Sequence, residues 1–100
     1  MLRKFLASML GNTLNFENGS AITWTSRESV RYMEAGYEVE VWVDLGKGFL
    51  SRKRVIKSES LRHWTRVPPN ASSRDISSSK RAAIIEKIRK YYAGRPVEVE

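Results

Sequence analysis

Six cations gather within fifteen residues in the second half of the chain, and they are its densest concentration of chemically active groups. The acid Glu59 lies within this run, and the rings of Phe49, His63 and Trp64 lie nearby. The cations are Arg52, Lys53, Arg54, Lys57, Arg62 and Arg66. Cations interleaved with aromatic rings suit a surface that follows phosphates and stacks bases. The same charge equally suits docking onto an acidic protein, or a solvated surface that only aids solubility.

No recognised nucleic-acid motif accompanies this run. The sequence contains no aromatic pattern of the RNP type, no KH loop, no zinc finger and no helix-turn-helix signature. The prediction that residues 52–66 bind RNA or DNA therefore rests on charge alone.

Groups that could perform catalysis are few. The chain has no cysteine, which excludes disulfides, thiolate metal sites and thiol catalysis. His63 is the only histidine, and no spacing supplies the partners of a triad or a zinc site. Glu38 and Glu40 share one face of an expected strand, where a solvent-facing polar row explains them as well as a carboxylate pair does. The sequence predicts a protein that is not an enzyme and needs no cofactor or metal.

The net charge of +7 is divided unevenly along the chain. Residues 1–50 hold five Lys/Arg and six Asp/Glu, whereas residues 51–100 hold thirteen and five. This asymmetry favours a polyanion or an acidic protein surface as the partner. No apolar stretch is long enough to span a membrane, and the short apolar run that Ser8 interrupts does not match a secretory signal. Together with the lack of cysteine, this predicts a cytoplasmic protein with no membrane partner.

Hydrophobic periodicity predicts the elements that position these groups. Alternation of apolar and polar residues indicates strands, with Gly36 in a hairpin turn between two of them. These strands are expected near residues 20–25, 30–33, 37–44, 52–57 and 97–100. Ser58 is expected to cap a short helical turn over 59–64.

Two segments carry helical periodicity. A long helix is predicted over residues 78–93, with Gly94 and Pro96 marking its end. Lys80 and Arg81 at its start have the wrong sign for the helix dipole, which suggests that another contact retains them. A short helix is predicted over residues 1–11, either peripheral on the domain or pairing with a second copy of the chain through its apolar face.

A chain of 100 residues accommodates one domain. The predicted fold is α+β, an antiparallel sheet of four to five strands with the long C-terminal helix on one face and the short N-terminal helix beside it. The expected core contains Trp64, Leu61, Ile84, Ile85, Ile88, Val39 and Val41. Alternation places Trp42 on the polar face of its strand, where it is a contact hot spot unless a helix covers that face.

The order of elements in residues 55–100 carries a family resemblance. A strand, a turn led by Ser58 with Leu61 and Trp64, the pair Pro68-Pro69, a helix preceded by Ile76 and the closing 97–100 follow one another. This order resembles an immunity-protein family of bacterial polymorphic toxin systems. The resemblance implies a cytoplasmic antidote that sequesters a cognate toxin by surface complementarity. Because the chain is basic, it implies either an acidic toxin surface or an interface on the acidic first half.

The sequence thus predicts a non-catalytic binding protein with a protein partner, in particular a toxin. The alternative is a small basic RNA- or DNA-binding protein that uses residues 52–66. A third alternative is self-association through the N-terminal helix. The candidate contact residues are Arg52, Lys53, Arg54, Lys57, Arg62, Arg66 and Trp42.

Overall fold

The structure is a computed structural model, and it describes residues 12–45 and 53–100. The N-terminal helix predicted over 1–11 and the candidate residue Arg52 lie outside the described residues. In chain order the elements are β1 (Thr13–Asn15), β2 (Ala21–Ser26), β3 (Ser29–Glu34), β4 (Tyr37–Leu45), β5 (Arg54–Ile56), the 3-10 helix η1 (Ser58–Leu61), α2 (Ser78–Tyr91) and β6 (Val97–Val99).

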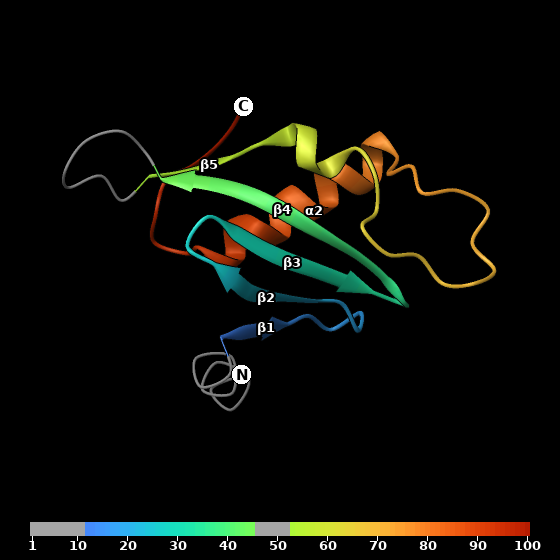
Figure 1. The fold of residues 1–100 in the computed structure, drawn as a ribbon. Coiled ribbons are helices and arrows are strands. Elements are labelled where there is room, and N and C mark those ends of the chain that lie inside the picture. Colours follow the sequence, from blue (N-terminus) through green and yellow to red (C-terminus); the bar gives the residue numbers. More distant parts are fainter. Residues whose placement is uncertain (1–11, 46–52) are drawn as a thin grey trace.

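The strands form one six-stranded sheet in the order β1-β2-β3-β4-β5-β6 (Figure 1). All neighbours are antiparallel except β5 and β6, which are parallel. The α+β class is confirmed, but the prediction of a wholly antiparallel sheet with four to five strands is wrong. The three residues of β1 are too few to show alternation. Parallel pairing of β5 with β6 needs a crossover connection, and the segment between them that contains α2 is long enough to provide one.

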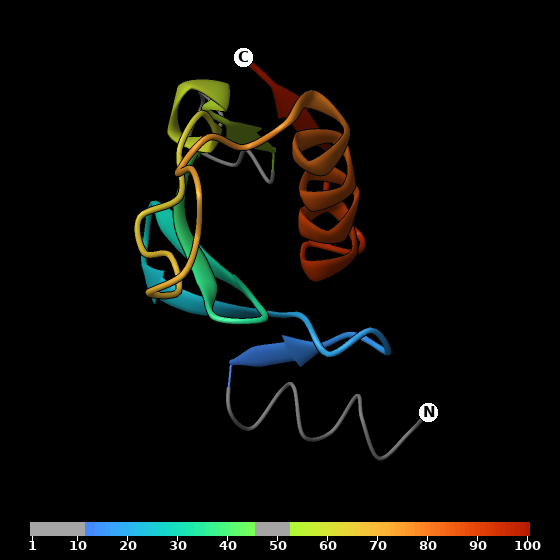
Figure 2. The ribbon, with the colours of Figure 1, turned by 90° about the vertical axis from the view of Figure 1, so that its right-hand side faces the viewer.

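One face of the sheet is covered by α2. Figure 2 shows the sheet curling around this helix, with β1 at one end of the curve and β6 at the other. Ile84 and Ile88 of α2 are fully buried against the sheet. Their partners in the core include Ile22, Val30, Tyr32, Val39, Val41, Val43 and Ile56. No helix of the described ranges is long and apolar enough to cross a membrane.

The core residues expected from the sequence are nearly all buried. Trp64 is 7% exposed, and the others have no exposed surface apart from Ile85, which is partly buried against the cluster. Ser58 does not cap η1 as expected, since its hydroxyl donates a hydrogen bond to the carbonyl of Glu100 at 2.6 Å. The long helix begins as predicted, and Ser77 caps it by accepting a hydrogen bond from the backbone amide of Lys80.

The hairpin between β3 and β4 is set by local sequence. Ala35 and Gly36 both have positive φ, 50° and 88°, as a two-residue turn of type I′ requires. This turn fixes the register in which Glu34 pairs with Tyr37 and Val30 pairs with Val41. The register determines which residues of β4 face α2 and which face away from it.

Candidate functional site

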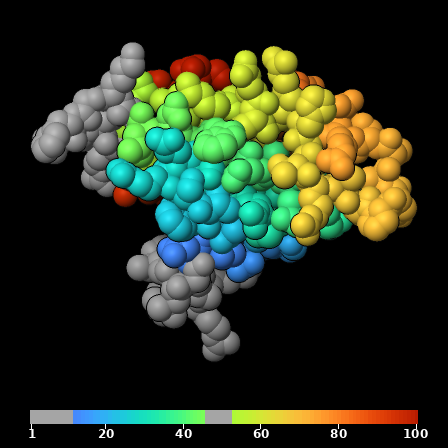
Figure 3. Space-filling model, in the orientation of Figure 1, coloured from blue at the N-terminus to red at the C-terminus, as the bar shows by residue number. Residues whose placement is uncertain are grey.

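The face of the sheet that turns away from α2 is open. Figure 3 shows this face, on which the atoms of β3 and β4 lie in view between the turns. Val39, Val41 and Val43 of β4 point toward α2 and are fully buried, so the residues between them point outward. Trp42 is one of these, and it is 47% exposed. The alternative in which the long helix covers this face is therefore wrong, and the alternative in which the N-terminal helix covers it lies outside the described residues.

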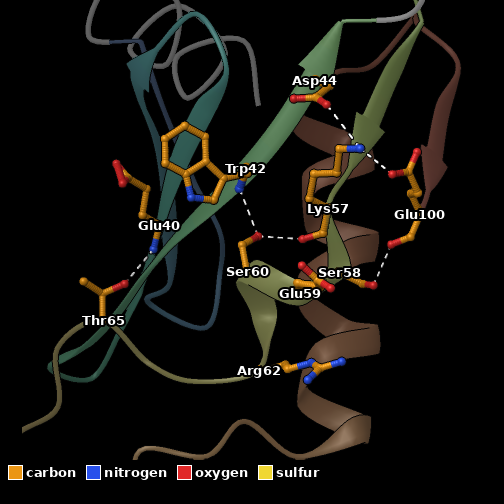
Figure 4. A pocket seen from close by; sticks show the side chains of 10 residues that line it. All are labelled: Glu40, Trp42, Asp44, Lys57, Ser58, Glu59, Ser60, Arg62, Thr65 and Glu100. Carbon is orange, nitrogen blue, oxygen red and sulfur yellow. Dashed lines mark hydrogen bonds and ion pairs between the residues drawn. The ribbon is translucent and has the colours of Figure 1, made fainter.

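A groove lies between β4 and the segment that contains η1. The backbone amide of Lys57 donates to the carbonyl of Trp42 at 2.8 Å. Beyond this contact, two side-chain hydroxyl groups accept the hydrogen bonds of β4 amides that a paired strand would otherwise accept. The amide of Trp42 donates to Ser60 Oγ at 3.0 Å, and the amide of Glu40 donates to Thr65 Oγ1 at 3.1 Å (Figure 4). Short polar side chains therefore replace part of a strand along this edge.

The groove has a volume of about 930 Å³. Figure 4 shows the ring of Trp42 and the side chain of Glu40 projecting to the same side of β4. The lining residues are Glu40, Trp42, Asp44, Lys57, Ser58, Glu59, Ser60, Arg62, Thr65 and Glu100.

The groove is acidic although the protein is basic. Its lining contains four carboxylates and two cations, a formal charge of −2 against +7 for the whole chain. Lys57 Nζ lies between Asp44 Oδ2, at 3.2 Å, and Glu100 Oε1. Its hydrogen bonds to Glu100 and Asp44 raise the pKa of Lys57, so this cation stays charged and is already paired. The sequence missed Glu59 and Glu100 as site residues, because no local pattern brings them beside β4.

The hydroxyl groups of the groove are engaged with the backbone. Ser60 Oγ donates to the carbonyl of Lys57 at 2.6 Å while it accepts from Trp42, and Ser58 Oγ donates to Glu100. A nucleophilic hydroxyl needs a base beside it, and these hydroxyls instead fix the chain. Within the described ranges no three His, Asp or Glu side chains gather as metal ligands. The groups that the groove presents to a ligand are carboxylates and an indole ring.

The predicted basic run does not form one surface. Lys53 is paired with Glu98 at 2.7 Å, and Lys57 is held as described. Arg54 lies on the face that carries α2, with its guanidinium carbon 5.6 Å from the centre of the Tyr92 ring. Arg62 lines the acidic groove, and the side chain of Arg66 is 76% exposed, 3.7 Å from Glu38. Of the candidate residues that the structure describes, Trp42, Lys57 and Arg62 line the groove.

The remaining candidate groups lie apart from the groove or take structural contacts. His63 Nε2 lies 3.1 Å from Asp75 Oδ1, and both side chains are well exposed. The carboxylate of Glu38 lies between two guanidinium groups, with its oxygens 3.7 Å from Arg31 Nε and 3.7 Å from Arg66 Nη1. Glu38 therefore forms ion pairs and does not act with Glu40 as a pair of carboxylates.

Comparisons of the chain with protein-family models, with curated proteins and with solved structures find no match.

Proposed function

We propose that the chain is a non-catalytic binding protein whose groove around Trp42 receives a protein partner with a cationic surface. The observation that carries this proposal is a half-exposed indole ring set among carboxylates on the open face of the sheet. Tryptophan is enriched among the residues that contribute most to protein interfaces, and its ring is a favourable surface for a Lys or Arg side chain.

Charge decides which class of partner suits this groove. Glu40, Glu59 and Asp44 would repel the phosphates of a nucleic acid, and they would attract Lys and Arg side chains. The distribution of charge therefore favours a basic protein surface here, whereas the total charge of the chain would suggest an acidic one.

The resemblance to an immunity-protein family supports a toxin as the partner and the cytoplasm as the place of action. Among the interfaces that the resemblance implies is one on the acidic first half of the chain. Glu40, Trp42 and Asp44 belong to that half, and they supply the β4 wall of the groove. The proposed toxin surface is therefore basic.

Affinity capture from a lysate of the source cells, treated with nuclease, tests the proposal. The wild-type protein should retain one protein partner, and the Trp42→Ala variant should lose it. Leu45→Ala is the matched control, because Leu45 is 43% exposed on the other face of the sheet and does not line the groove. Capture that depends on nucleic acid, or that Trp42→Ala leaves intact, contradicts the proposal.

The purified partner then allows a quantitative test. Loss of the ring should weaken binding by about 2 kcal/mol, a factor of about 30 in Kd, measured by calorimetry. Glu40→Gln and Glu59→Gln should each weaken binding more at low salt than at high salt, because screening already reduces their attraction for cations. For a toxin partner, co-expression of wild-type protein should restore growth, and co-expression of Trp42→Ala should not.

A further inference from the structure

A second exposed tryptophan lies on the opposite face of the sheet. Trp24 of β2 pairs with Val30 of β3, whose side chain is buried beneath α2, so Trp24 points to the helix side. Trp24 is nevertheless 51% exposed, because it lies beyond the C-terminal end of the helix. Trp24 does not line the groove around Trp42, so the partner proposed for that groove does not explain why Trp24 is exposed.

Trp24 forms one wall of a pocket at the end of α2. The pocket has a volume of about 590 Å³ and brings together the turn between β2 and β3, the start of β5 and the last residues of the helix. Its lining contains three aromatic rings, three guanidinium groups and no carboxylate. The lining residues are Trp24, Arg27, Arg54, Tyr91, Tyr92, Ala93 and Arg95.

Two of the rings are held in place. The rings of Tyr91 and Tyr92 meet edge to face with centroids 5.1 Å apart, and the Tyr91 hydroxyl donates to the carbonyl of Asn12 at 3.1 Å. Arg54 lies over the Tyr92 ring. This wall is therefore built before any ligand arrives.

Two of the cations are exposed to solvent. Arg27 and Arg95 take part in none of the ion pairs found between the residues that the structure describes. A guanidinium group presents a planar fork of donors that matches the oxygens of a phosphate.

We propose that this pocket binds single-stranded nucleic acid. Phosphates of the strand contact Arg27 and Arg95, and a base stacks on the exposed ring of Trp24. A single strand fits because its bases are free to stack, whereas the bases of a duplex are covered by their neighbours. The site shares only Arg54 with the basic run 52–66, and the inference is independent of the proposed partner at the Trp42 groove.

The dipole of α2 opposes the binding of an anion here, but its effect is smaller than that of the arginine side chains in the pocket. The C-terminal end of a helix carries about −0.5 of an elementary charge. Three guanidinium groups surround the end of α2, each with a full positive charge, and no carboxylate lines the pocket. The local potential is therefore positive.

Fluorescence anisotropy with a short labelled oligothymidylate tests the inference. Trp24→Ala should weaken binding about tenfold with an unchanged salt dependence, because stacking contributes affinity without contacting phosphate. Trp24→Phe keeps a ring and should restore most of the affinity. The double variant Arg27→Gln with Arg95→Gln should reduce the slope of log K against log salt by about 1.4, since each phosphate contact on a single strand contributes about 0.7.

The matched control removes the same charge elsewhere. Arg31 and Arg74 are both exposed and lie outside this pocket and the groove, so the double change Arg31→Gln with Arg74→Gln should alter affinity less than about twofold. Unchanged thermal unfolding of each variant shows that the fold is retained.

Several outcomes would overturn the inference. These are no binding at low salt, equal weakening by the control pair, or a duplex of the same length bound as tightly as the single strand. Inorganic polyphosphate and an acidic peptide serve as competitors. If either competes as well as the oligonucleotide and Trp24→Ala has no effect, the pocket recognises negative charge and not a base.

Discussion

Glu34 lies at the interface between the sheet and α2, where it connects two cations and a tyrosine. Its Oε2 is 2.7 Å from Lys80 Nζ, and its Oε1 accepts a hydrogen bond from the Tyr32 hydroxyl. Lys87 Nζ in turn donates to Tyr32 at 3.2 Å and to Ser20 at 3.0 Å. Within the part of the chain that the structure describes, no buried side-chain nitrogen or oxygen lacks a partner. Lys80 has the wrong sign for the helix dipole, and Glu34 is the contact that retains it.

Burial and hydrogen bonding shift the pKa values of this cluster. Burial, together with the hydrogen bond to Glu34, raises the pKa of Tyr32 to about 12. Burial lowers the pKa of Lys87. Partial burial alone would raise the pKa of Glu34, but hydrogen bonds from Lys80 and Tyr32 outweigh it and hold this pKa below 4.5. The carboxylate is therefore bound more favourably in its ionised form than in its protonated form.

A pH prediction follows for Glu34. Because its folded pKa is lower than its unfolded pKa, its contribution to stability is complete above pH 4.5 and is lost as the pH falls through the folded pKa. Urea unfolding between pH 7 and pH 3 should show the free energy of unfolding of wild-type protein falling more steeply than that of Glu34→Gln. Parallel curves for the two proteins would contradict this role. Arg89→Gln is a control, since it removes only an exposed pair with Glu86.

At the scale of elements, the edge of β4 determines whether a groove exists. A full strand beside residues 38–42 would pair with their backbone and fill the space in which Trp42 is exposed. The chain instead forms η1 and contacts β4 through the side chains of Ser60 and Thr65. Their hydroxyl oxygens accept hydrogen bonds from the backbone amides of Trp42 and Glu40, respectively. Further along, the backbone of Glu38 pairs again with Thr65 and Arg66. The groove is a gap in an otherwise hydrogen-bonded edge.

Removal of one hydroxyl should open this edge locally. Ser60→Ala leaves the Trp42 amide without its acceptor, and the free energy of unfolding should fall by about 1 to 2 kcal/mol. Amide hydrogen exchange, followed by NMR, should accelerate at Trp42 and remain unchanged at Glu40. Thr65→Val, which conserves side-chain volume, should give the reverse pattern. Exchange at Trp42 that is insensitive to Ser60→Ala would show that solvent or another group satisfies the amide.

At the scale of the whole molecule, the two faces of the sheet each carry one site, and the linings of the two sites have opposite net charge. The open face places four carboxylates around Trp42, and the helix face places three arginines around Trp24. The net charge of the whole chain, +7, does not show the sign of the charge at either tryptophan. The two exposed tryptophans are therefore expected to meet ions of opposite sign.

Ionic quenching of tryptophan fluorescence should resolve the two faces. Caesium, a cation, should concentrate near Trp42, and iodide, an anion, should concentrate near Trp24, while Trp64 is only 7% exposed and contributes little to either signal. Trp42→Phe should remove most of the caesium quenching, and Trp24→Phe most of the iodide quenching. Both differences should diminish as an inert salt screens the charges. Equal loss of both signals in either variant would contradict the separation of charge.

The sequence by itself determined the elements whose patterns are local. Alternation over residues 37–44 and helical spacing over residues 78–93 predicted β4 and α2, together with the core residues that they bury. Alternation also placed Trp42 on the polar face of its strand. These patterns are legible because burial of one face constrains every second residue of a strand, or every third to fourth residue of a helix.

Tertiary structure decided what lies across from each face. The parallel pairing of β5 with β6, the separation of Arg54 from Lys53 and Lys57, and the approach of Glu59 and Glu100 to β4 all join residues that no local period relates. A run of cations in the sequence does not show whether its side chains will share one surface. Successive side chains of a strand point to opposite faces, and the acids that form salt bridges with them lie far away in the sequence. The charge of each binding surface was therefore set by the fold.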